Sequence, residues 1–179
     1  MVVVDNKILG EGGFSQVKLG TDAGDFRKKY ALKRILLQSS EDEASASLEI
    51  NYLKAFIHPN IVSFLGCSYT IEEGRKVVYL LFPLVSRGTL RHRWNAILEG
   101  NAAPFKLPHL LSSFSAIMSA CALLHNSSPS YVHRDIKPEN ILLSDDDMPL
   151  LTDFGSVGKA VVKVNNRSDV SRSLGYSTR

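Results

Sequence analysis

The chain has 179 residues, of which 44% are hydrophobic and 22% are charged. A length of this size is typical of one domain or slightly more, and the composition excludes an intrinsically disordered chain. The formal net charge is +3, and Lys and Arg are scattered among the acidic residues. With no basic block and no stripe of alternating basic and aromatic residues, the sequence gives no indication of a nucleic-acid partner.

Targeting and redox features point to an intracellular protein. The longest unbroken apolar run, residues 77–85, has nine residues and contains a proline. It is too short to cross a bilayer, so we expect no transmembrane helix. The first residues show neither a signal peptide nor the glycine needed for an N-terminal lipid anchor. Cys67 and Cys121 lie far from each other and lack metal-ligand spacing, so a reducing, cytoplasmic location is expected.

The first part of the chain has the patterns of a β-rich lobe. Alternating and β-branched residues predict three strands, over 2–9, 16–21 and 29–36, with a polar turn at 22–25. The segment 40–43 reads as a capping box, and a helix follows in which Ala46, Ile50, Leu53 and Ile57 share one face. Two more strands, over 61–67 and 76–82, are predicted to join across the turn 72–74.

The second part has mainly helical patterns. The linker 86–88 precedes two predicted helices, over 89–99 and 108–125, and the second carries Leu111, Phe114, Met118, Ala122 and His125 along one side. Two short strands follow, over 141–143 and 150–152, and the acidic run 145–147 between them is better explained as a solvated turn than as a metal site. We therefore expect an α+β chain with a small β-rich lobe at 1–85 and the start of a mainly helical lobe at 86–179.

A glycine-rich segment separates the first two predicted strands. Glycines allow backbone N–H groups to approach a phosphate without interference from Cβ atoms. A purely structural turn explains the segment about equally well. A Rossmann loop does not, because a strand follows it where that fold needs a helix. The residues of this loop are Gly10, Glu11, Gly12, Gly13, Phe14 and Ser15.

A lysine, Lys33, lies inside the third predicted strand. It is either an edge lysine whose ammonium reaches solvent or an ammonium held over the phosphates of a nucleotide. The second role needs a counter-charge, and Glu49 on the predicted helix is the candidate because it shares the helical face of Leu53.

The strongest pattern is His133-Arg134-Asp135-Ile136-Lys137-Pro138-Glu139-Asn140, followed by Asp153-Phe154-Gly155. An Asp, a Lys and an Asn precede a predicted strand, and a second Asp follows the next strand. These groups suit a hydroxyl, a phosphate and Mg²⁺, which prefers few carboxylate oxygens together with phosphate oxygens. Phosphoryl transfer asks a protein mainly for such positioning and charge neutralisation.

Together, these motifs resemble those of the eukaryotic protein kinases, in the same order along the chain. The resemblance implies the bilobal protein-kinase fold: a five-stranded N-lobe with one helix, and a helical C-lobe that is incomplete here. The lysine at position 137 of this loop resembles the serine/threonine kinases, which carry a lysine at this place, more than the tyrosine kinases. The glycine-rich loop, the segments 81–83 and 87–90, and Ser156 are most similar to the Numb-associated kinases, in particular the branch of myristoylated and palmitoylated kinases.

The resemblance also implies residue roles, with ATP and Mg²⁺ as cofactors and a protein Ser/Thr hydroxyl as acceptor. Lys33, paired with Glu49, would contact the α- and β-phosphates. Asp135 would orient the substrate hydroxyl and Lys137 would neutralise the γ-phosphate, while Asn140 and Asp153 would hold Mg²⁺. The glycine-rich loop would cover the phosphates. The adenine would lie among Val17, Ala31 and Leu142, beside the gatekeeper Phe82, the carbonyl of Pro83 and the backbone of Val85.

Further roles follow from the same resemblance. Four residues would stack as a regulatory spine: Leu53, Phe64, His133 and Phe154. Arg134 would need an anionic partner, and phosphorylation of the last segment would supply one; the candidates are Ser168, Ser171, Ser173, Ser177 and Thr178. His133 and His58 are interpreted as packing and turn residues rather than bases.

The chain ends before the Ala-Pro-Glu motif that such kinases carry. We therefore expect the helix 108–125 to lack a partner on one side, and the chain alone to be unstable or inactive as a kinase. The leading hypothesis is a protein serine/threonine kinase represented by a fragment or truncated form. The alternative is a non-catalytic module that binds nucleotide or a partner. A small-molecule phosphotransferase is disfavoured by Lys137.

Overall fold

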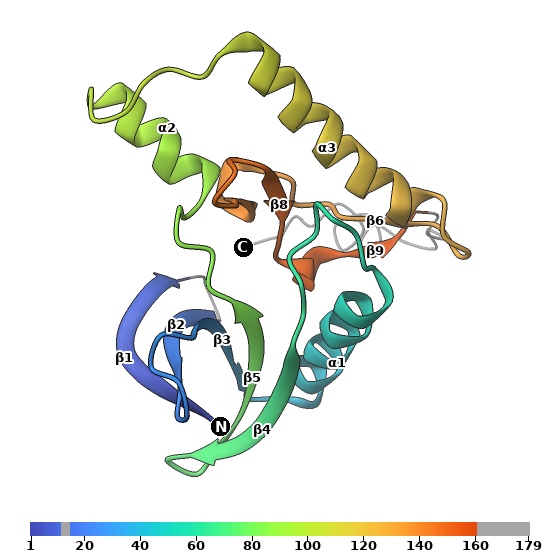
Figure 1. Cartoon of the computed structure of the whole chain (residues 1–179). Coiled ribbons are helices and arrows are strands. Elements are labelled where there is room, and N and C mark those ends of the chain that lie inside the picture. The colour runs from blue at the N-terminus through green and yellow to red at the C-terminus, as the bar shows by residue number, and fades with distance from the viewer. Residues whose placement is uncertain (12–14, 161–179) are drawn as a thin grey trace. The chain divides into compact units, whose positions relative to one another are not determined.

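The computed structural model describes residues 1–11 and 15–160 (Figure 1). The chain divides into two compact units. The first consists of Met1–Ile57 and Val62–Ser86, and the second of His58–Ile61 and the chain from Arg87 onward. The fold is α+β, with a five-stranded sheet and helices.

The first unit is built on an antiparallel sheet with strand order β1-β2-β3-β5-β4. Its middle strand is β3, and the neighbouring strand β5 carries the fully buried Val77, Val78 and Leu80. The edge strands are β1 and β4. The strands are β1 (Val2–Glu11), β2 (Ser15–Asp22), β3 (Lys29–Leu37), β4 (Gly66–Glu72) and β5 (Arg75–Pro83).

The predicted position of β4 was wrong. The expected strand 61–67 does not form. Its first residues, Ile61 and Val62, are buried, but Ile61 makes only an isolated bridge, to Leu151 in the second unit. The paired strand begins at Gly66 and is mostly exposed, so it lacks the apolar pattern that marks a strand in a sequence. The turn between β4 and β5 lies where it was predicted. Glu73 and Gly74 both have positive φ, as a two-residue type I′ hairpin requires.

One helix, α1 (Ser40–Ala55), packs against β3 of the first unit. Its capping box is formed by Ser39 and Asp42, one residue earlier than predicted, because the Ser39 hydroxyl accepts from the Asp42 N–H at 3.1 Å. Ala46, Glu49, Ile50 and Leu53 are buried, as the helical spacing indicated. The helix ends at Ala55, so the placement of Ile57 on this face was wrong; its side chain is 84% exposed.

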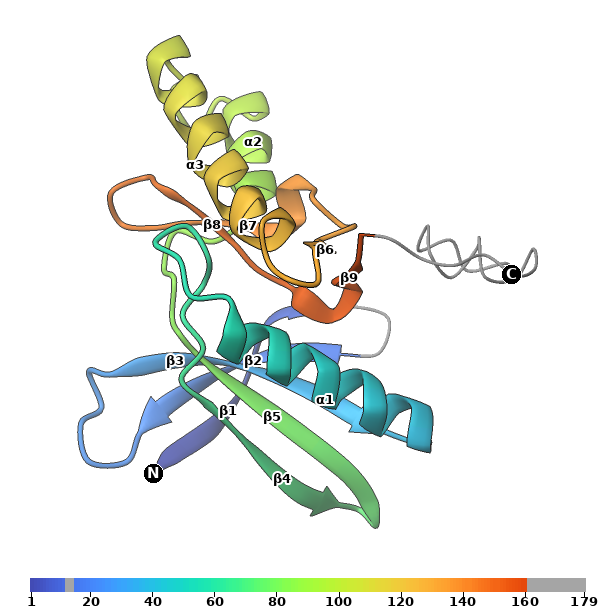
Figure 2. The same cartoon turned by 90° about the vertical axis from the view of Figure 1, so that its right-hand side faces the viewer.

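As far as residue 160, the second unit contains two helices and two small sheets (Figure 2). The helices are α2 (Leu90–Leu98) and α3 (Leu107–His125), both close to the predicted ranges. The sheets pair β7 (Ile141–Leu143) with β8 (Pro149–Leu151), and β6 (Tyr131–Val132) with β9 (Gly158–Lys159); the sequence did not predict the second pair. Two 3₁₀ turns, η1 (Pro138–Asn140) and η2 (Phe154–Ser156), complete the unit.

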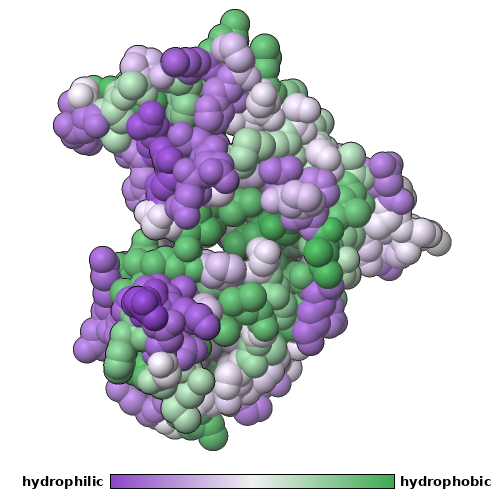
Figure 3. Space-filling view, viewed as in Figure 1, coloured by the Kyte–Doolittle hydropathy of each residue, from purple (hydrophilic) through white to green (hydrophobic). Residues whose placement is uncertain are grey.

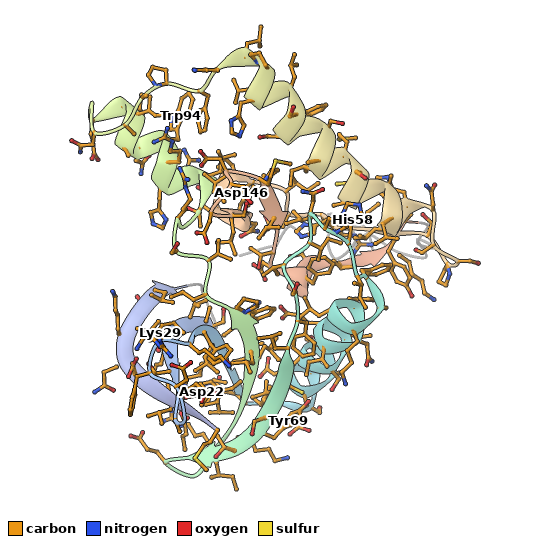
Figure 4. All side chains as sticks on the ribbon, in the orientation of Figure 1. Asp22, Lys29, His58, Tyr69, Trp94 and Asp146 are labelled. Carbon is orange, nitrogen blue, oxygen red and sulfur yellow. The ribbon has the colours of Figure 1, made fainter. Side chains whose placement is uncertain are left out.

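The acidic run 145–147 is confirmed as the turn of the β7–β8 hairpin, where Figure 4 labels Asp146. Asp147 adopts a positive φ of 59° and pairs with Arg87 at 2.7 Å. His58 is likewise confirmed as a hydrogen-bonded turn residue: its Nδ1 accepts from the Asn60 N–H at 3.0 Å, and its Nε2 lies 3.1 Å from the Ser119 hydroxyl on α3.

Helix α3 has apolar residues on its buried side and on a neighbouring exposed side. Ile117, Ala120, Cys121 and Leu124 are buried, and α3 contacts β6 and β8. The predicted apolar stripe flanks this buried side and is exposed, with Leu111 and Phe114 at 62% and 67% exposure. By length and composition α3 is also apolar enough to cross a membrane, with only 28% of the relevant window buried. Ser and His residues interrupt the sequence of α3, so it contains no long unbroken apolar run.

Candidate active site

In the first unit, strand register gathers the predicted nucleotide residues on one face of the sheet. Val17 lies opposite Lys33, and Ala31 lies opposite Phe82. Ala31 and Lys33 are two residues apart on β3 and therefore point to the same face. Directly paired residues of antiparallel strands share a face, so all four side chains lie on one side of the sheet.

The predicted counter-charge for Lys33 is present. The Lys33 Nζ donates to the Glu49 Oε1 at 2.8 Å, and the two side chains are only 14% and 6% exposed. Glu49 comes from the buried face of α1, so the pair joins the helix to β3. A lysine held in this way has a fixed direction, which a solvated edge lysine lacks. The structure thus favours the interpretation of Lys33 as a positioned ammonium.

The segment after β5 has the backbone groups that an adenine edge needs. Phe82 is buried, and Pro83 ends the strand opposite Tyr30. Among the described residues, neither the N–H nor the carbonyl of Val85 takes part in a backbone hydrogen bond. A proline lacks an N–H, so Val85 is the residue of this pair that has both a donor and an acceptor.

The glycine-rich loop is described at its two ends. Gly10 and Glu11 end β1, and Ser15 begins β2. Glu11 accepts from the Gln16 side chain at 2.9 Å, which closes the base of the hairpin. A Cβ built on Gly10 meets no atom within 4 Å, so the backbone here is open to a ligand. The predictions for Gly12, Gly13 and Phe14 lie outside the described residues.

In the second unit, two predicted catalytic residues and one predicted metal ligand form one hydrogen-bonded cluster. The Asp135 Oδ2 accepts from the Lys137 Nζ and from the Asn140 Nδ2, each at 2.8 Å. The Asn140 Nδ2 also donates to the Asp135 carbonyl at 3.0 Å. Both donors converge on one carboxylate oxygen, so Asp135 is held in a defined orientation. The ammonium of Lys137 has a raised pKa, above all through its hydrogen bond to Asp135, and stays charged at neutral pH.

Asn140 and Asp153, the predicted Mg²⁺ ligands, are brought together by the β7–β8 hairpin. Ile141 pairs with Leu151, and the Thr152 N–H donates to the Asn140 carbonyl at 3.0 Å, which places Asp153 next along the chain. The Asn140 amide nitrogen donates to Asp135, so the amide oxygen is the atom that would bind a cation. Asp153 has the positive φ of 62° that is frequent at functional sites.

This donor set fits magnesium better than a transition metal. One carboxylate and one amide oxygen match the hard oxygen ligands of Mg²⁺, which usually completes its shell with phosphate and water. Within the described ranges, 1–11 and 15–160, no three His, Cys, Asp or Glu side chains form a metal-binding group. Any Mg²⁺ bound by Asn140 and Asp153 therefore needs the phosphates of a nucleotide as well.

His133 is confirmed as a packing residue. It is 2% exposed, its ring meets that of Phe154 edge-on at 5.3 Å, and its Nε2 lies 3.1 Å from the Thr152 carbonyl. A carbonyl only accepts, so Nε2 is the protonated nitrogen of the neutral ring. The Nδ1 is buried and has no hydrogen-bond partner in the part of the chain that the structure describes. Burial lowers the pKa of His133, so the ring is neutral near pH 7.

The lowered pKa of His133 predicts a stability that depends on pH. The unfolded chain binds a proton near pH 6.5, whereas the folded chain resists it, so the free energy of unfolding falls as the pH drops below about 6.5. Urea unfolding of the protein between pH 7.5 and 5.5 measures this loss. We expect His133→Gln to be less stable at pH 7.5 but to have a smaller slope over this range. An unchanged slope would show that other groups cause it.

Thr152 is a site residue that the sequence did not single out. Its N–H holds the Asn140 carbonyl and its own carbonyl holds His133, so it links the predicted metal ligands to the packing histidine. Both contacts are made by the backbone, and a sequence carries no mark of such contacts beyond the position next to Asp153.

The other residues with predicted roles lie in both units. Leu142 lies on β7, and Leu53 is buried in α1. Phe64 meets the ring of Phe82 at 5.9 Å. Arg134, which has a positive φ, donates to the Lys159 carbonyl at 2.7 Å. The five proposed phosphorylation sites between Ser168 and Thr178 lie outside the described residues.

Comparison with known proteins settles the family. The sequence pattern of the protein kinase domain matches residues 3–178. The chain belongs to the protein kinase domain family. The match includes residues 107–125, so α3 is a helix of this folded domain. Its contacts to β6 and β8 agree with this.

Curated relatives agree with this assignment. The chain is 37% identical over 173 residues to serine/threonine-protein kinase 16 of Rattus norvegicus, and 36% identical to the protein of the same name from Homo sapiens; each match covers 91% of this chain and 54% of the relative. A probable serine/threonine-protein kinase of Dictyostelium discoideum is 38% identical over 78% of this chain and 39% of its own length. The chain thus spans about half the length of the first two relatives.

Proposed function

We propose that the protein of which this chain forms at least a part is a serine/threonine kinase that transfers the γ-phosphate of ATP to Ser or Thr hydroxyls of proteins. The observation that carries the proposal is the cluster in which Lys137 and Asn140 hold one oxygen of Asp135. The other oxygen of that carboxylate, Oδ1, takes part in neither of these hydrogen bonds and would accept one from an acceptor hydroxyl. Lys137 supplies a positive charge beside it, where a transferred phosphoryl group carries negative charge.

ATP and Mg²⁺ are the proposed cofactors. Lys33 would contact the phosphates, Val85 and Pro83 would meet the adenine edge, and Asn140 with Asp153 would hold Mg²⁺. The bound metal neutralises charge on the phosphates. The residues of this chain orient the acceptor through Asp135 and keep Lys33 in place through Glu49.

Phosphorylation by the purified full-length protein tests the proposal. With labelled ATP, Mg²⁺ and a mixture of protein substrates, we expect label on Ser and Thr, and its loss when EDTA removes the metal. Lys33→Ala and Asp135→Ala should each abolish the transfer. Label on Tyr alone, or on small molecules alone, would contradict the proposal. Cellular effects that survive both substitutions would favour the non-catalytic module.

We also propose that the chain lies closest to the Numb-associated kinases, within the branch of myristoylated and palmitoylated kinases. Support comes from the glycine-rich loop, the segments 81–83 and 87–90, and Ser156 after the Asp-Phe-Gly motif. A phylogeny of complete kinase domains tests this placement. Grouping of the complete protein outside that branch would reject it.

A cytoplasmic location is proposed as well. Both cysteines are free, Cys67 on the surface and Cys121 buried in α3, as is usual in a reducing compartment. Fractionation of source cells is expected to recover the protein with cytosolic markers. Recovery with lumenal or secreted markers would contradict it.

A further inference from the structure

An ion pair lies at the first turn of α2, next to the catalytic cluster in the chain. The Arg91 Nε donates to the Glu139 Oε1 at 2.7 Å, and each side chain is 44% exposed. Glu139 belongs to η1, between Lys137 and Asn140 in the motif. The side chains at this point are therefore both accessible to solvent and engaged with each other.

Both partners are held by the surrounding backbone. Helix α2 packs against η1 and β7. Just before Arg91, the Leu143 N–H donates to the Gly88 carbonyl at 2.9 Å, and Thr89 forms an antiparallel bridge with Leu142. Glu139 directly precedes Asn140, which is fixed to Asp135. The ion pair thus links two anchored segments and does not depend on a loop.

Glu139 acts electrostatically on the catalytic cluster. Its pKa is lowered chiefly by the hydrogen bond from Arg91, and it contributes in turn to the raised pKa of Lys137, whose main cause is Asp135. An acceptor hydroxyl bound at Asp135 brings the neighbouring substrate residues into this field. Without Arg91, Glu139 would offer them an unpaired carboxylate, which attracts Arg or Lys.

Other charges of this region are also paired or directed elsewhere. Arg87 pairs with Asp147 at 2.7 Å. Arg93 points to the Ala103 carbonyl and the Phe105 ring. Hydrophilic residues dominate the surface over α2 (Figure 3). Figure 4 labels Trp94, the residue of α2 that follows Arg93. Arg91 is therefore the basic side chain that, in the described residues, hydrogen-bonds Glu139, while Lys137, paired with Asp135, acts on it as a further nearby charge.

We propose that Arg91 is a specificity-determining residue: by occupying Glu139, it removes selection for basic side chains beside the acceptor hydroxyl. The substrates are then Ser/Thr segments with no required Arg or Lys near the acceptor. This inference rests on the proposed kinase function, since it concerns the peptide that Asp135 receives.

Peptide phosphorylation by the full-length protein and its Arg91→Ala variant tests the inference. Each peptide pair has one Ser and differs only by Ala or Arg at one position within four residues of it. For each protein, the ratio of kcat/KM for the Arg peptide to that for the Ala peptide is measured. We expect ratios near one for the wild type. In Arg91→Ala we expect a gain of about two- to fivefold at one or two positions, the size typical of a partly exposed charge pair.

Two further variants make the result specific. Arg27→Ala removes the same charge from a 93% exposed side chain that pairs with Asp25 in the first unit, and should keep the wild-type ratios. Arg91→Ala combined with Glu139→Gln should lose the gain, because the carboxylate is then absent. A gain in Arg27→Ala, or one that persists in the double variant, would overturn the inference.

Binding of the same peptides, measured by fluorescence anisotropy, separates this inference from the proposed function. Peptides that bind with the expected affinity ratios but are not phosphorylated would contradict the kinase function and support the role of Arg91. Phosphorylation with unchanged ratios in Arg91→Ala would do the reverse. A wild type that already prefers Arg would also overturn the inference.

Discussion

Replacement of Asp135 by Asn is expected to lower phosphoryl transfer by about 10²–10⁴-fold, the range typical of a lost general base. The reason lies in the chemistry of the group and not in its packing. In the wild type, Lys137 and Asn140 donate to the Asp135 Oδ2 at 2.8 Å. The amide oxygen of an asparagine can accept the same two hydrogen bonds. What is lost is the negative charge that attracts the acceptor proton.

The measurement for Asp135→Asn is kcat with a Ser peptide at saturating ATP, together with the dissociation constant of ATP and the midpoint of urea unfolding. We expect kcat alone to collapse. Asp146→Asn is the matched control, since Asp146 is exposed in the β7–β8 turn, and it should keep kcat within about twofold. A kcat for Asp135→Asn within tenfold of the wild type would show that Asp135 is not the group that receives the acceptor.

The parts of the site that could be predicted are those in which the chemistry is local in the chain. Asp135, Lys137 and Asn140 lie within six consecutive residues, and the structure joins them directly. Lys33 and Glu49 are farther apart, yet a lysine inside an apolar strand and a carboxylate on the buried helical face each leave a pattern in the sequence. Their contact at 2.8 Å agrees with that prediction.

The parts that could not be predicted depend on partners distant in the chain or on backbone groups. The strand β4 is mostly exposed, because an edge strand buries few side chains. The apolar residues before it, Ile61 and Val62, have the stronger strand pattern, so the strand was predicted too early in the chain. Strands β6 and β9 have two residues each, too few for any periodicity. The pairing of Arg91 with Glu139 spans 48 positions, and nothing in either residue type indicates it.

The same distinction explains the error at the start of α1. Both Ser39 and Ser40 precede acidic residues, so two capping registers fit the sequence. The register with Ser39 is adopted, in which Asp42 accepts from the N–H groups of Ser39 and Gln38 at 3.0 and 2.9 Å. The cap moves the start of α1 by one residue without changing which residues share a face, and Glu49 reaches Lys33 from the buried face that the helical spacing predicted.

The second large effect is expected from Glu49→Ala, which should lower the free energy of unfolding by about 3 kcal/mol or more, the typical result of breaking a buried ion pair. The substitution removes the carboxylate 2.8 Å from the Lys33 Nζ, while the lysine is only 14% exposed and hydrates poorly. Glu43→Ala is a control on the same helix. Its pair with Lys76 is also short, at 2.7 Å, but exposed, so its loss should cost at most about 1 kcal/mol.

A double variant distinguishes the role of the Lys33–Glu49 pair in stability from its role in function. Lys33→Met with Glu49→Leu removes both charges and fills the space with apolar side chains, which often restores stability. We expect urea unfolding to recover to near the wild-type value, while phosphoryl transfer and ATP affinity stay low because no ammonium meets the phosphates. Recovery of transfer in the double variant would show that the pair serves only to join α1 to β3, and that another cation binds the nucleotide.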